Sequence, residues 1–342
     1  MREFLLESYD YHLPQELIAK YPIFPKESAK LLVYDKKSQK ISHTNFFHLF
    51  DFIPRDALLV FNDTKVLKAR VYGNKRSGAR IEIFFHKELK NGIFLVQMRG
   101  KVKQNDRILI SPDYEVEVVA LRDNGFREVI FYHQQSQLNS FDVYKMLKEV
   151  GHIPLPPYIK RDDDVSDEKE YQSVFARHYG AVAAPTASLH FSENMMSFIE
   201  ENYQSLFLTL HVGAGTFMSV ESKDIRDHQI HSEILVASKE KIKKLKEASK
   251  VCCIGTTAMR SVEFLARRDM EEDFSGECDI FLNLANLPIK TQLLLTNFHL
   301  PKSTLLMLVS AMVGLDECHR IYQEAIRKKY RFYSYGDGML IL

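Results

Sequence analysis

The chain has 342 residues, of which 45% are hydrophobic and 27% are charged, and its formal net charge is +1. This composition excludes a disordered, collagen-like or low-complexity chain, and the length exceeds the roughly 250 to 300 residues at which single hydrophobic cores stop growing. We therefore expect two domains and examine how the charge is distributed between them.

The N-terminus predicts neither export nor membrane insertion. Residues 1–13 contain Glu3, Glu7 and Asp10 and lack a small-residue cleavage site, so they do not resemble a signal peptide. The most apolar run, 305–315, is shorter than the about 20 residues that span a bilayer, and we expect a buried helix there. These features predict a cytoplasmic protein without membrane contact.

Positive charge is concentrated in one segment. Between Lys65 and Arg107, twelve basic residues stand against three acidic ones, which gives this segment a charge of +9 and leaves −8 for the rest of the chain. Apolar and polar residues alternate over 80–85 and 93–98, and a turn signal at 91–92 separates the two runs, which predicts a small antiparallel β domain. Its basic residues form either a solvated face or a phosphate-binding surface, and charge alone does not decide between these two.

Beyond Gly151 the pattern changes to alternating strands and helices. Apolar strands are predicted over 206–212 and 251–254, and helices over 238–250 and 257–268. Short strands followed by helices predict an α/β domain with parallel strands and a site at their carboxyl ends.

Polar or glycine-rich residues follow several of the predicted strands. Because such residues are costly at strand ends unless they line a cavity, we expect these segments to converge on one site. Gly213 and Gly215 indicate a tight turn, a close approach of a ligand to the backbone, or both. The segments are Val60 to Thr64, Leu210 to Thr216, Ile254 to Arg260 and Leu295 to Ser303.

Two cations stand near predicted helix starts. Thr256 or Thr257 suits an N-cap, which would place Arg260 in the first helical turn, and Pro301 suits the first helical position before Lys302. A cation is unfavourable there by a few tenths of a kcal/mol because of the helix dipole. We therefore expect Arg260 and Lys302 to bind a carboxylate or phosphate; the alternative is a salt bridge to a neighbouring domain.

His211 and His299 each follow an apolar strand and are candidates for proton transfer, although a hydrogen-bonded core histidine is the commoner case. Asp227, His228, His231 and Glu233 are the densest group of candidate metal ligands. Their spacing matches no standard metal motif and no cysteine joins them, so we expect no metal.

Motifs that resemble one protein family run along the whole chain. They are Tyr9 to Pro14, Leu59 to Thr64 with Ala69-Arg70, Gly151 to Ile159, Gly180 to Ala187 with Leu189 to Phe191, Leu210 to Phe217, His231 to Glu233, Thr296 to Leu308, and Tyr330 to Phe332 with Ser334 to Asp337. The family is the S-adenosylmethionine:tRNA ribosyltransferase-isomerases, which make epoxyqueuosine in tRNA. The sequence departs from its pattern at Ser188 (usually Gly), Ala258-Met259 (more often Ser-Val), Gly338 (usually Ala) and 283–290, which lacks a Pro-Gly-Tyr turn.

The resemblance implies an α/β fold with an α/β-barrel-like main domain, residues 1–66 and 151–342, and an inserted antiparallel β-barrel domain, residues 67–150. It implies transfer and isomerisation of the ribosyl group of S-adenosylmethionine onto 7-aminomethyl-7-deazaguanine at the wobble position of a tRNA with a GUN anticodon. Epoxyqueuosine forms, and adenine and methionine are released. S-adenosylmethionine is then a co-substrate, and we expect a monomer with no further cofactor.

The implied chemistry assigns roles to the candidate residues. Proton transfer is expected from His211 or His299, and contact with the substrate amine or ribose hydroxyls from Asp63 or Asp337. Donor binding is expected from Gly213, Gly215, Thr256, Thr257, Arg260 and Lys302, and tRNA binding from Arg70, Lys101, Lys103 and Arg107.

Two alternatives stay open at this point. A tRNA methyltransferase would use the same donor and release S-adenosylhomocysteine. A non-catalytic tRNA-binding protein would keep the basic segment but would have no use for cations at helix starts.

Overall fold

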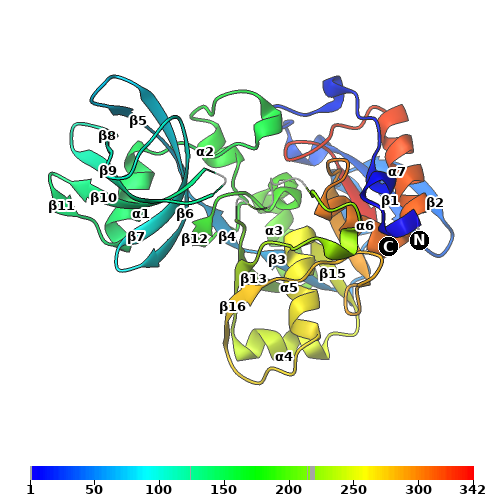
Figure 1. The fold of residues 1–342 in the computed structure, drawn as a ribbon. Coiled ribbons are helices and arrows are strands. Elements are labelled where there is room, and N and C mark those ends of the chain that lie inside the picture. Colours follow the sequence, from blue (N-terminus) through cyan, green and yellow to red (C-terminus); the bar gives the residue numbers. More distant parts are fainter. Residues whose placement is uncertain (1, 124, 214, 216–219) are drawn as a thin grey trace.

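The computed structural model describes residues 2–123, 125–213, 215 and 220–342. Its strands form a nine-stranded mixed sheet, a seven-stranded antiparallel sheet and a small two-stranded sheet. Figure 1 shows the antiparallel sheet on one side of the molecule, the nine-stranded sheet with most helices on the other, and β4 and β12 between them.

The antiparallel sheet is a closed barrel. Pairing of β9 with β10 closes a ring of six strands, and β11 extends from β10. Alternate side chains such as Ile81, Ile83 and Phe85 fill the interior, and helix α1 packs Val143 and Met146 against it. The elements are β5 (Arg70–Lys75), β6 (Arg80–Lys90), β7 (Ile93–Arg99), β8 (Arg107–Leu109), β9 (Tyr114–Leu121), β10 (Phe126–His133), β11 (Ser136–Gln137) and α1 (Ser140–Val150).

The nine-stranded sheet has the order β16-β14-β13-β3-β15-β17-β18-β1-β2, and β13, β3, β15 and β17 run parallel. The chain runs from β3 outward to β13 on one side and from β15 outward to β17 on the other. The carboxyl ends of β3 and β15 therefore flank a topological switch point, where ligands bind in such sheets. The strands are β1 (Lys30–Asp35), β2 (Lys40–Asn45), β3 (Leu58–Asn62), β13 (Gln204–His211), β14 (Glu233–Ala237), β15 (Val251–Ile254), β16 (Phe274–Cys278), β17 (Leu293–Asn297) and β18 (Gly338–Ile341); β4 (Thr64–Val66) and β12 (His178–Ala181) form the two-stranded sheet.

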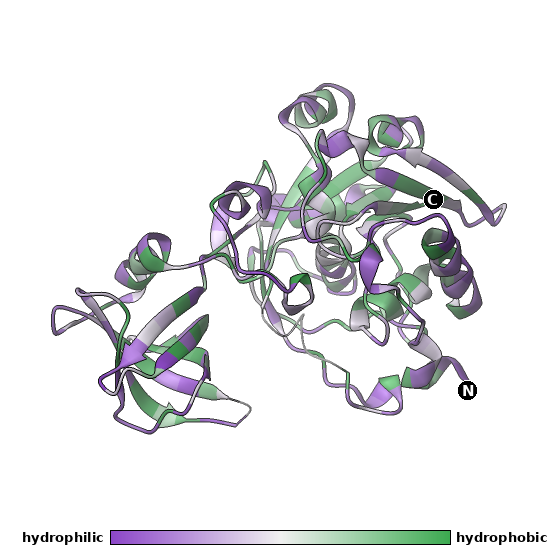
Figure 2. Ribbon diagram, turned by 90° about the horizontal axis from the view of Figure 1, so that it is seen from above, coloured by the Kyte–Doolittle hydropathy of each residue, from purple (hydrophilic) through white to green (hydrophobic). Residues whose placement is uncertain are grey.

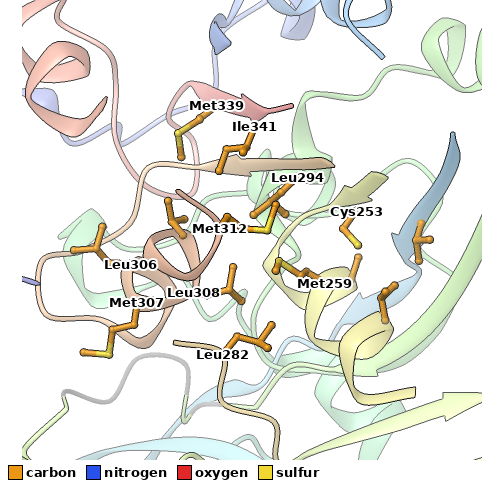
Figure 3. Packing of buried hydrophobic residues seen from close by; sticks show 14 of the residues in the cluster. Cys253, Met259, Leu282, Leu294, Leu306, Met307, Leu308, Met312, Met339 and Ile341 are labelled. Atoms are coloured by element: carbon orange, nitrogen blue, oxygen red, sulfur yellow. The ribbon is translucent and has the colours of Figure 1, made fainter. Parts of the chain in front are cut away.

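Helices cover both faces of this sheet. Helices α4 to α7 pack on the face that carries Val60 and Cys253, and α3, η5 and η7 pack on the face that carries Phe61 and Cys252. Figure 3 shows the first of these layers, and Figure 2 shows that apolar residues concentrate on the strands inside. The helices are α2 (Asp167–Glu170), α3 (Glu193–Asn202), α4 (Lys239–Glu247), α5 (Thr256–Ala266), α6 (Thr304–Val313) and α7 (Leu315–Arg327), with 3-10 helices η1 (Arg2–Phe4), η2 (Leu6–Tyr9), η3 (Gln15–Leu17), η4 (Lys26–Ser28), η5 (Phe46–Asp51), η6 (Pro157–Ile159), η7 (Thr186–His190) and η9 (Ile225–Asp227).

The predicted fold class, an α/β main domain with an inserted antiparallel β-barrel, is confirmed. The main-domain strands form one mixed sheet. Strands β5 to β11 and helix α1 lie within the predicted insertion of residues 67–150, whose exact boundaries stay a prediction. The run 305–315 contains the buried helix α6, and no helix in the described ranges is long and apolar enough to cross a membrane.

Two buried carboxylates fix loops of the main domain. Asp167 accepts hydrogen bonds from both terminal nitrogens of Arg161, at 2.6 and 2.7 Å, and from the Tyr335 hydroxyl at 2.7 Å. Glu263 pairs with Arg267 and accepts the amide N–H groups of 289–291 at 2.8 to 2.9 Å, so it anchors the end of the atypical 283–290 segment. Breaking one partner of such buried groups costs about 3 to 5 kcal/mol.

Candidate active site

A cavity of about 100 Å³ opens at the carboxyl ends of the parallel strands. Its walls come from residues 183–187, the start of α5, residues 296–300 after β17, and Tyr333-Ser334 before β18. These segments are far apart in the sequence, and the strand order brings them together. Three of the four strand-end segments predicted to converge, 210–216, 254–260 and 295–303, contribute residues to the two cavities, whereas no residue of Val60 to Thr64 lines either of them. Tyr158 and Tyr171 complete an aromatic side of the cavity.

The N-terminus of α5 lies in the wall of this cavity. Its N-cap is Gly255, with φ of 96°, and no side chain caps the helix. The first amide N–H groups of a helix have no partner within it, so this end attracts an anion. Thr256 lines the cavity, and the buried hydroxyl of Thr257 has no hydrogen-bond partner among the described residues. The arrangement suits a carboxylate or phosphate.

A buried ion pair joins Glu233 and Arg260 beside this helix start. One carboxylate oxygen of Glu233 accepts from Nη1 of Arg260 and the other accepts from the N–H of Gly213 at 3.0 Å. Arg260 also donates to the carbonyls of Ile280 at 3.2 Å and Cys278 at 3.3 Å. Among the described residues, three of its five N–H groups have a hydrogen-bond partner and two have none.

The sequence-based placement of Arg260 is wrong in one respect. Helix α5 begins at Thr256, so Arg260 is its fifth residue rather than a first-turn residue. The dipole effect fades beyond the first turn, and Glu233 is an anionic partner within the protein. Arg260 still lines the cavity, so its proposed contact with a ligand stays open.

A second cavity of about 60 Å³ lies behind the ion pair. Gly213 and Gly215 line it, and Glu233, Arg260 and Leu305 line both cavities. The two predicted glycines therefore lie next to the first cavity, whose wall contains the start of α5. Ala214 and 216–219 lie outside the described residues.

Lys302 is placed differently from the prediction. Helix α6 begins at Thr304 with Ser303 as N-cap, and Lys302 has φ of 55°, so Pro301 is not the first helical residue. The ammonium of Lys302 pairs with Glu7 at 2.8 Å and Asp10 at 3.0 Å. Lys302 lines neither cavity, and its salt bridges join two parts of the predicted main domain rather than two domains.

His299 lies in the cavity wall. The ring Nε2 of His299 is 2.8 Å from the hydroxyl of Thr296. Its backbone N–H donates to the Tyr322 hydroxyl at 3.0 Å, and its backbone carbonyl accepts from the Tyr11 hydroxyl. Burial lowers the pKa of His299 to about 3. The imidazole is therefore neutral at physiological pH and a weak base.

His211 lies outside this cavity. Because successive strand residues point to opposite faces, Val212 lines the cavity and His211 points away from it, with Nδ1 2.8 Å from the Thr64 hydroxyl. Burial lowers the pKa of His211. A Cβ on Gly180 would lie 2.6 Å from its Nδ1, so only glycine leaves room for this ring.

Asp63 belongs to the same polar cluster as His211. Its carboxylate accepts from the Thr209 hydroxyl at 2.6 Å and lies 3.7 Å from Nε2 of the exposed His178. Strands β4 and β12, which flank this cluster, lie between the main sheet and the barrel (Figure 1). The structure thus brings Asp63 and His211 together and separates them from His299.

Asp337 holds two loops. Its oxygens accept the N–H groups of Lys30 at 3.0 Å and Arg331 at 2.7 Å, and burial raises its pKa. Asp337 is not among the residues that line the cavity, although Ser334 three residues earlier is. Its predicted contact with substrate stays untested.

The basic segment folds against acidic strands. Arg107 pairs with Glu117 at 2.8 Å and Glu115 at 3.5 Å on β9, and Arg70 pairs with Glu82 at 3.3 Å. The ammonium groups of the exposed Lys101 and Lys103 have no ion-pair partner within the described ranges. The four predicted tRNA contacts therefore divide into two arginines with ion-pair partners and two lysines without one among the described residues.

No cluster of three or more His, Cys, Asp or Glu side chains that could hold a metal ion is present in the described part of the chain. Glu233, which we considered only as a metal ligand, is instead the anion of the cavity wall. The sequence did not reveal this role, because both faces of the strand are apolar there, with Leu235 and Ala237 on one face and Ile234 and Val236 on the other. In the structure Glu233 shares the buried face with Leu235 and Ala237. A carboxylate on the apolar face of a strand needs a partner or a function.

Comparisons with known proteins cover the whole chain. The family described as "Queuosine biosynthesis protein" matches residues 6–341. S-adenosylmethionine:tRNA ribosyltransferase-isomerases from Helicobacter pylori (strain HPAG1) and Campylobacter jejuni (strain 81116) are 57% and 50% identical, each over all of this chain and 100% and 99% of the relative. The crystal structure of an S-adenosylmethionine tRNA ribosyltransferase from Thermotoga maritima is similar with a TM-score of 0.56 and 30% identity, over 98% of this chain and all of that one.

The environment of His299 predicts that its ring stays neutral from pH 8 down to about 4, because its pKa is about 3 and an ordinary histidine protonates near 6.5. The ¹⁵N chemical shifts of the ring, assigned by comparison with a His299→Gln variant, measure this directly. A change of the ring ¹⁵N chemical shifts centred near pH 6.5 would show that His299 is solvated rather than buried.

Proposed function

The chain belongs to the S-adenosylmethionine:tRNA ribosyltransferase-isomerase family of queuosine biosynthesis, and from this we propose the complete reaction. The enzyme transfers and isomerises the ribosyl group of S-adenosylmethionine onto 7-aminomethyl-7-deazaguanine at the tRNA wobble position. Epoxyqueuosine forms, and adenine and methionine leave. The observation that carries this proposal is the uncapped start of α5 in a cavity at the strand ends.

In this proposal the cavity binds S-adenosylmethionine. The methionine carboxylate accepts hydrogen bonds from the first amides of α5 and from the hydroxyl of Thr257, which lacks another partner among the described residues. The two remaining N–H groups of Arg260 are available to the same carboxylate. Gly213 and Gly215 let the donor approach the backbone beside Glu233.

Proton transfer needs groups on two sides of the donor. The sulfonium acidifies the neighbouring ribose hydrogens, and departing adenine needs a proton. His299, neutral and inside the cavity, is suited to hydrogen bonding with the donor, whereas its low pKa makes it a weak base. We propose that His211 and Asp63, which lie outside the cavity on the side of the barrel, contact the aminomethyl base of the tRNA.

The barrel is the proposed tRNA-binding surface. Lys101 and Lys103 supply free positive charge, while the charges of Arg70 and Arg107 are offset by neighbouring glutamates. The target base has to leave its stack to reach a cavity, which suits the wobble nucleotide of an anticodon loop. We further propose that the substrate carries a GUN anticodon and that the enzyme works as a monomer in the cytoplasm.

The reaction products test the proposed function. Incubating the protein with S-adenosylmethionine and tRNA that carries the aminomethyl base should release adenine and methionine in equal amounts, as measured by chromatography with mass detection. Release of S-adenosylhomocysteine would instead identify a methyltransferase. No turnover of a donor that binds normally would identify a binding protein.

The barrel surface makes a second prediction. The double variant Lys101→Gln, Lys103→Gln should weaken tRNA binding and flatten the dependence of log K on log salt by roughly 1.5, because each lost phosphate contact removes about 0.7 to 0.9. Arg107→Gln should have a smaller effect because Glu117 and Glu115 already offset its charge. Filter binding at several salt concentrations measures both variants.

Two exposed lysines of α4, Lys243 and Lys244, provide the matched control, because α4 lies away from the barrel (Figure 1). Their change to Gln should leave the salt dependence unaltered. If the α4 and barrel variants behaved alike, the barrel would not be the tRNA-binding surface.

A further inference from the structure

Among the described residues that line the first cavity, Glu233 is the only carboxylate, and Arg260 is the only basic side chain apart from His299. His299 adds no charge because burial keeps it neutral. The remaining polar groups of the first cavity are hydroxyls and the amide of Asn297. The charge that a ligand meets in this wall is therefore set by a single ion pair.

Both residues of the ion pair are buried. Glu233 is 6% exposed and Arg260 is 8% exposed, so neither charge is screened by water. In such surroundings a neighbouring charge acts more strongly than it does at a protein surface. With Glu233 ionised the wall is neutral overall; without it, Arg260 would make the wall cationic.

S-adenosylmethionine carries a positive sulfonium in addition to its amino-acid charges, whereas S-adenosylhomocysteine has a neutral thioether in the same place. A cationic wall would repel the sulfonium, and a carboxylate within it attracts the sulfonium. A carboxylate has about four lone-pair directions, and the described contacts of Glu233 use two of them. Because Glu233 also lines the first cavity, its negative charge acts on a cation bound there.

We infer that Glu233 is the specificity-determining residue for the sulfonium: it cancels the charge of Arg260 and supplies the only negative charge that faces the donor's sulfur from the described cavity walls. This inference rests on the proposed function, because it requires the donor to occupy the cavity. It gives the enzyme a physical reason to prefer the reactive sulfonium over the thioether.

Calorimetric titration of both compounds into the free enzyme tests the inference. The unmodified protein should bind S-adenosylmethionine at least about tenfold more tightly than S-adenosylhomocysteine. Glu233→Gln keeps the shape and one acceptor oxygen, and it should lower this ratio at least about tenfold. Glu233→Asp keeps the charge and should retain the preference even where both affinities fall.

A double variant, Glu233→Gln with Arg260→Gln, guards against misfolding because it leaves no buried charge without a partner. It should also lose the preference, since the carboxylate is gone. Glu263→Gln is the matched control. Glu263 is another buried glutamate, it forms an ion pair with Arg267 at the end of α5, and it lines neither cavity. Its ratio should equal that of the unmodified protein.

An unchanged ratio in Glu233→Gln and in the double variant would overturn the inference while leaving the donor site in place. Equal affinity of the unmodified protein for the two compounds would overturn it as well. Failure of the unmodified protein to bind S-adenosylmethionine at all would contradict the proposed function itself. The two failures are therefore distinguishable.

Discussion

The buried ion pair between Glu233 and Arg260 is the constraint on which the rest of the site depends. It connects the edge region of the sheet at β14 to helix α5, and through Gly213 and the carbonyls of 278 and 280 it fixes the loops on either side. Loss of one partner of such a pair costs about 3 to 5 kcal/mol because the other charge stays buried. The chain therefore has to keep both residues together, and the start of α5 is held in the cavity wall as a result.

The strand order explains why this wall can also bind a ligand. Strands β3 and β15 lie side by side at the switch point, so the segments that follow the parallel strands meet at one edge although they are hundreds of residues apart. The barrel is inserted after β4, and β12 returns the chain to pair with β4 beside His211. This topology places a surface with free lysines and a cavity with an open helix start in one chain. A tRNA-modifying enzyme needs both.

The sequence predicted the architecture and three of the four converging strand-end segments, because apolar periodicity and polar strand ends are local signals. The segment Val60 to Thr64 instead ends in the cluster of Asp63 and His211. It could not place Arg260 or Lys302, because the N-cap of α5 is a glycine without a capping side chain and Pro301 belongs to a turn before Ser303. It could not separate His211 from Val212, since alternation shows that they face opposite ways but not which face holds a cavity. The partners of Arg107 depend on strand register, which the charge pattern does not encode.

The central claim is that S-adenosylmethionine binds in the cavity at the carboxyl ends of the parallel strands. A crystal structure of the protein with this donor bound tests it most directly. The account predicts the methionine carboxylate at the first amides of α5, beside Thr257, and the sulfur next to Glu233. A donor bound instead in the cluster of Asp63 and His211, with the start of α5 empty, would contradict the account.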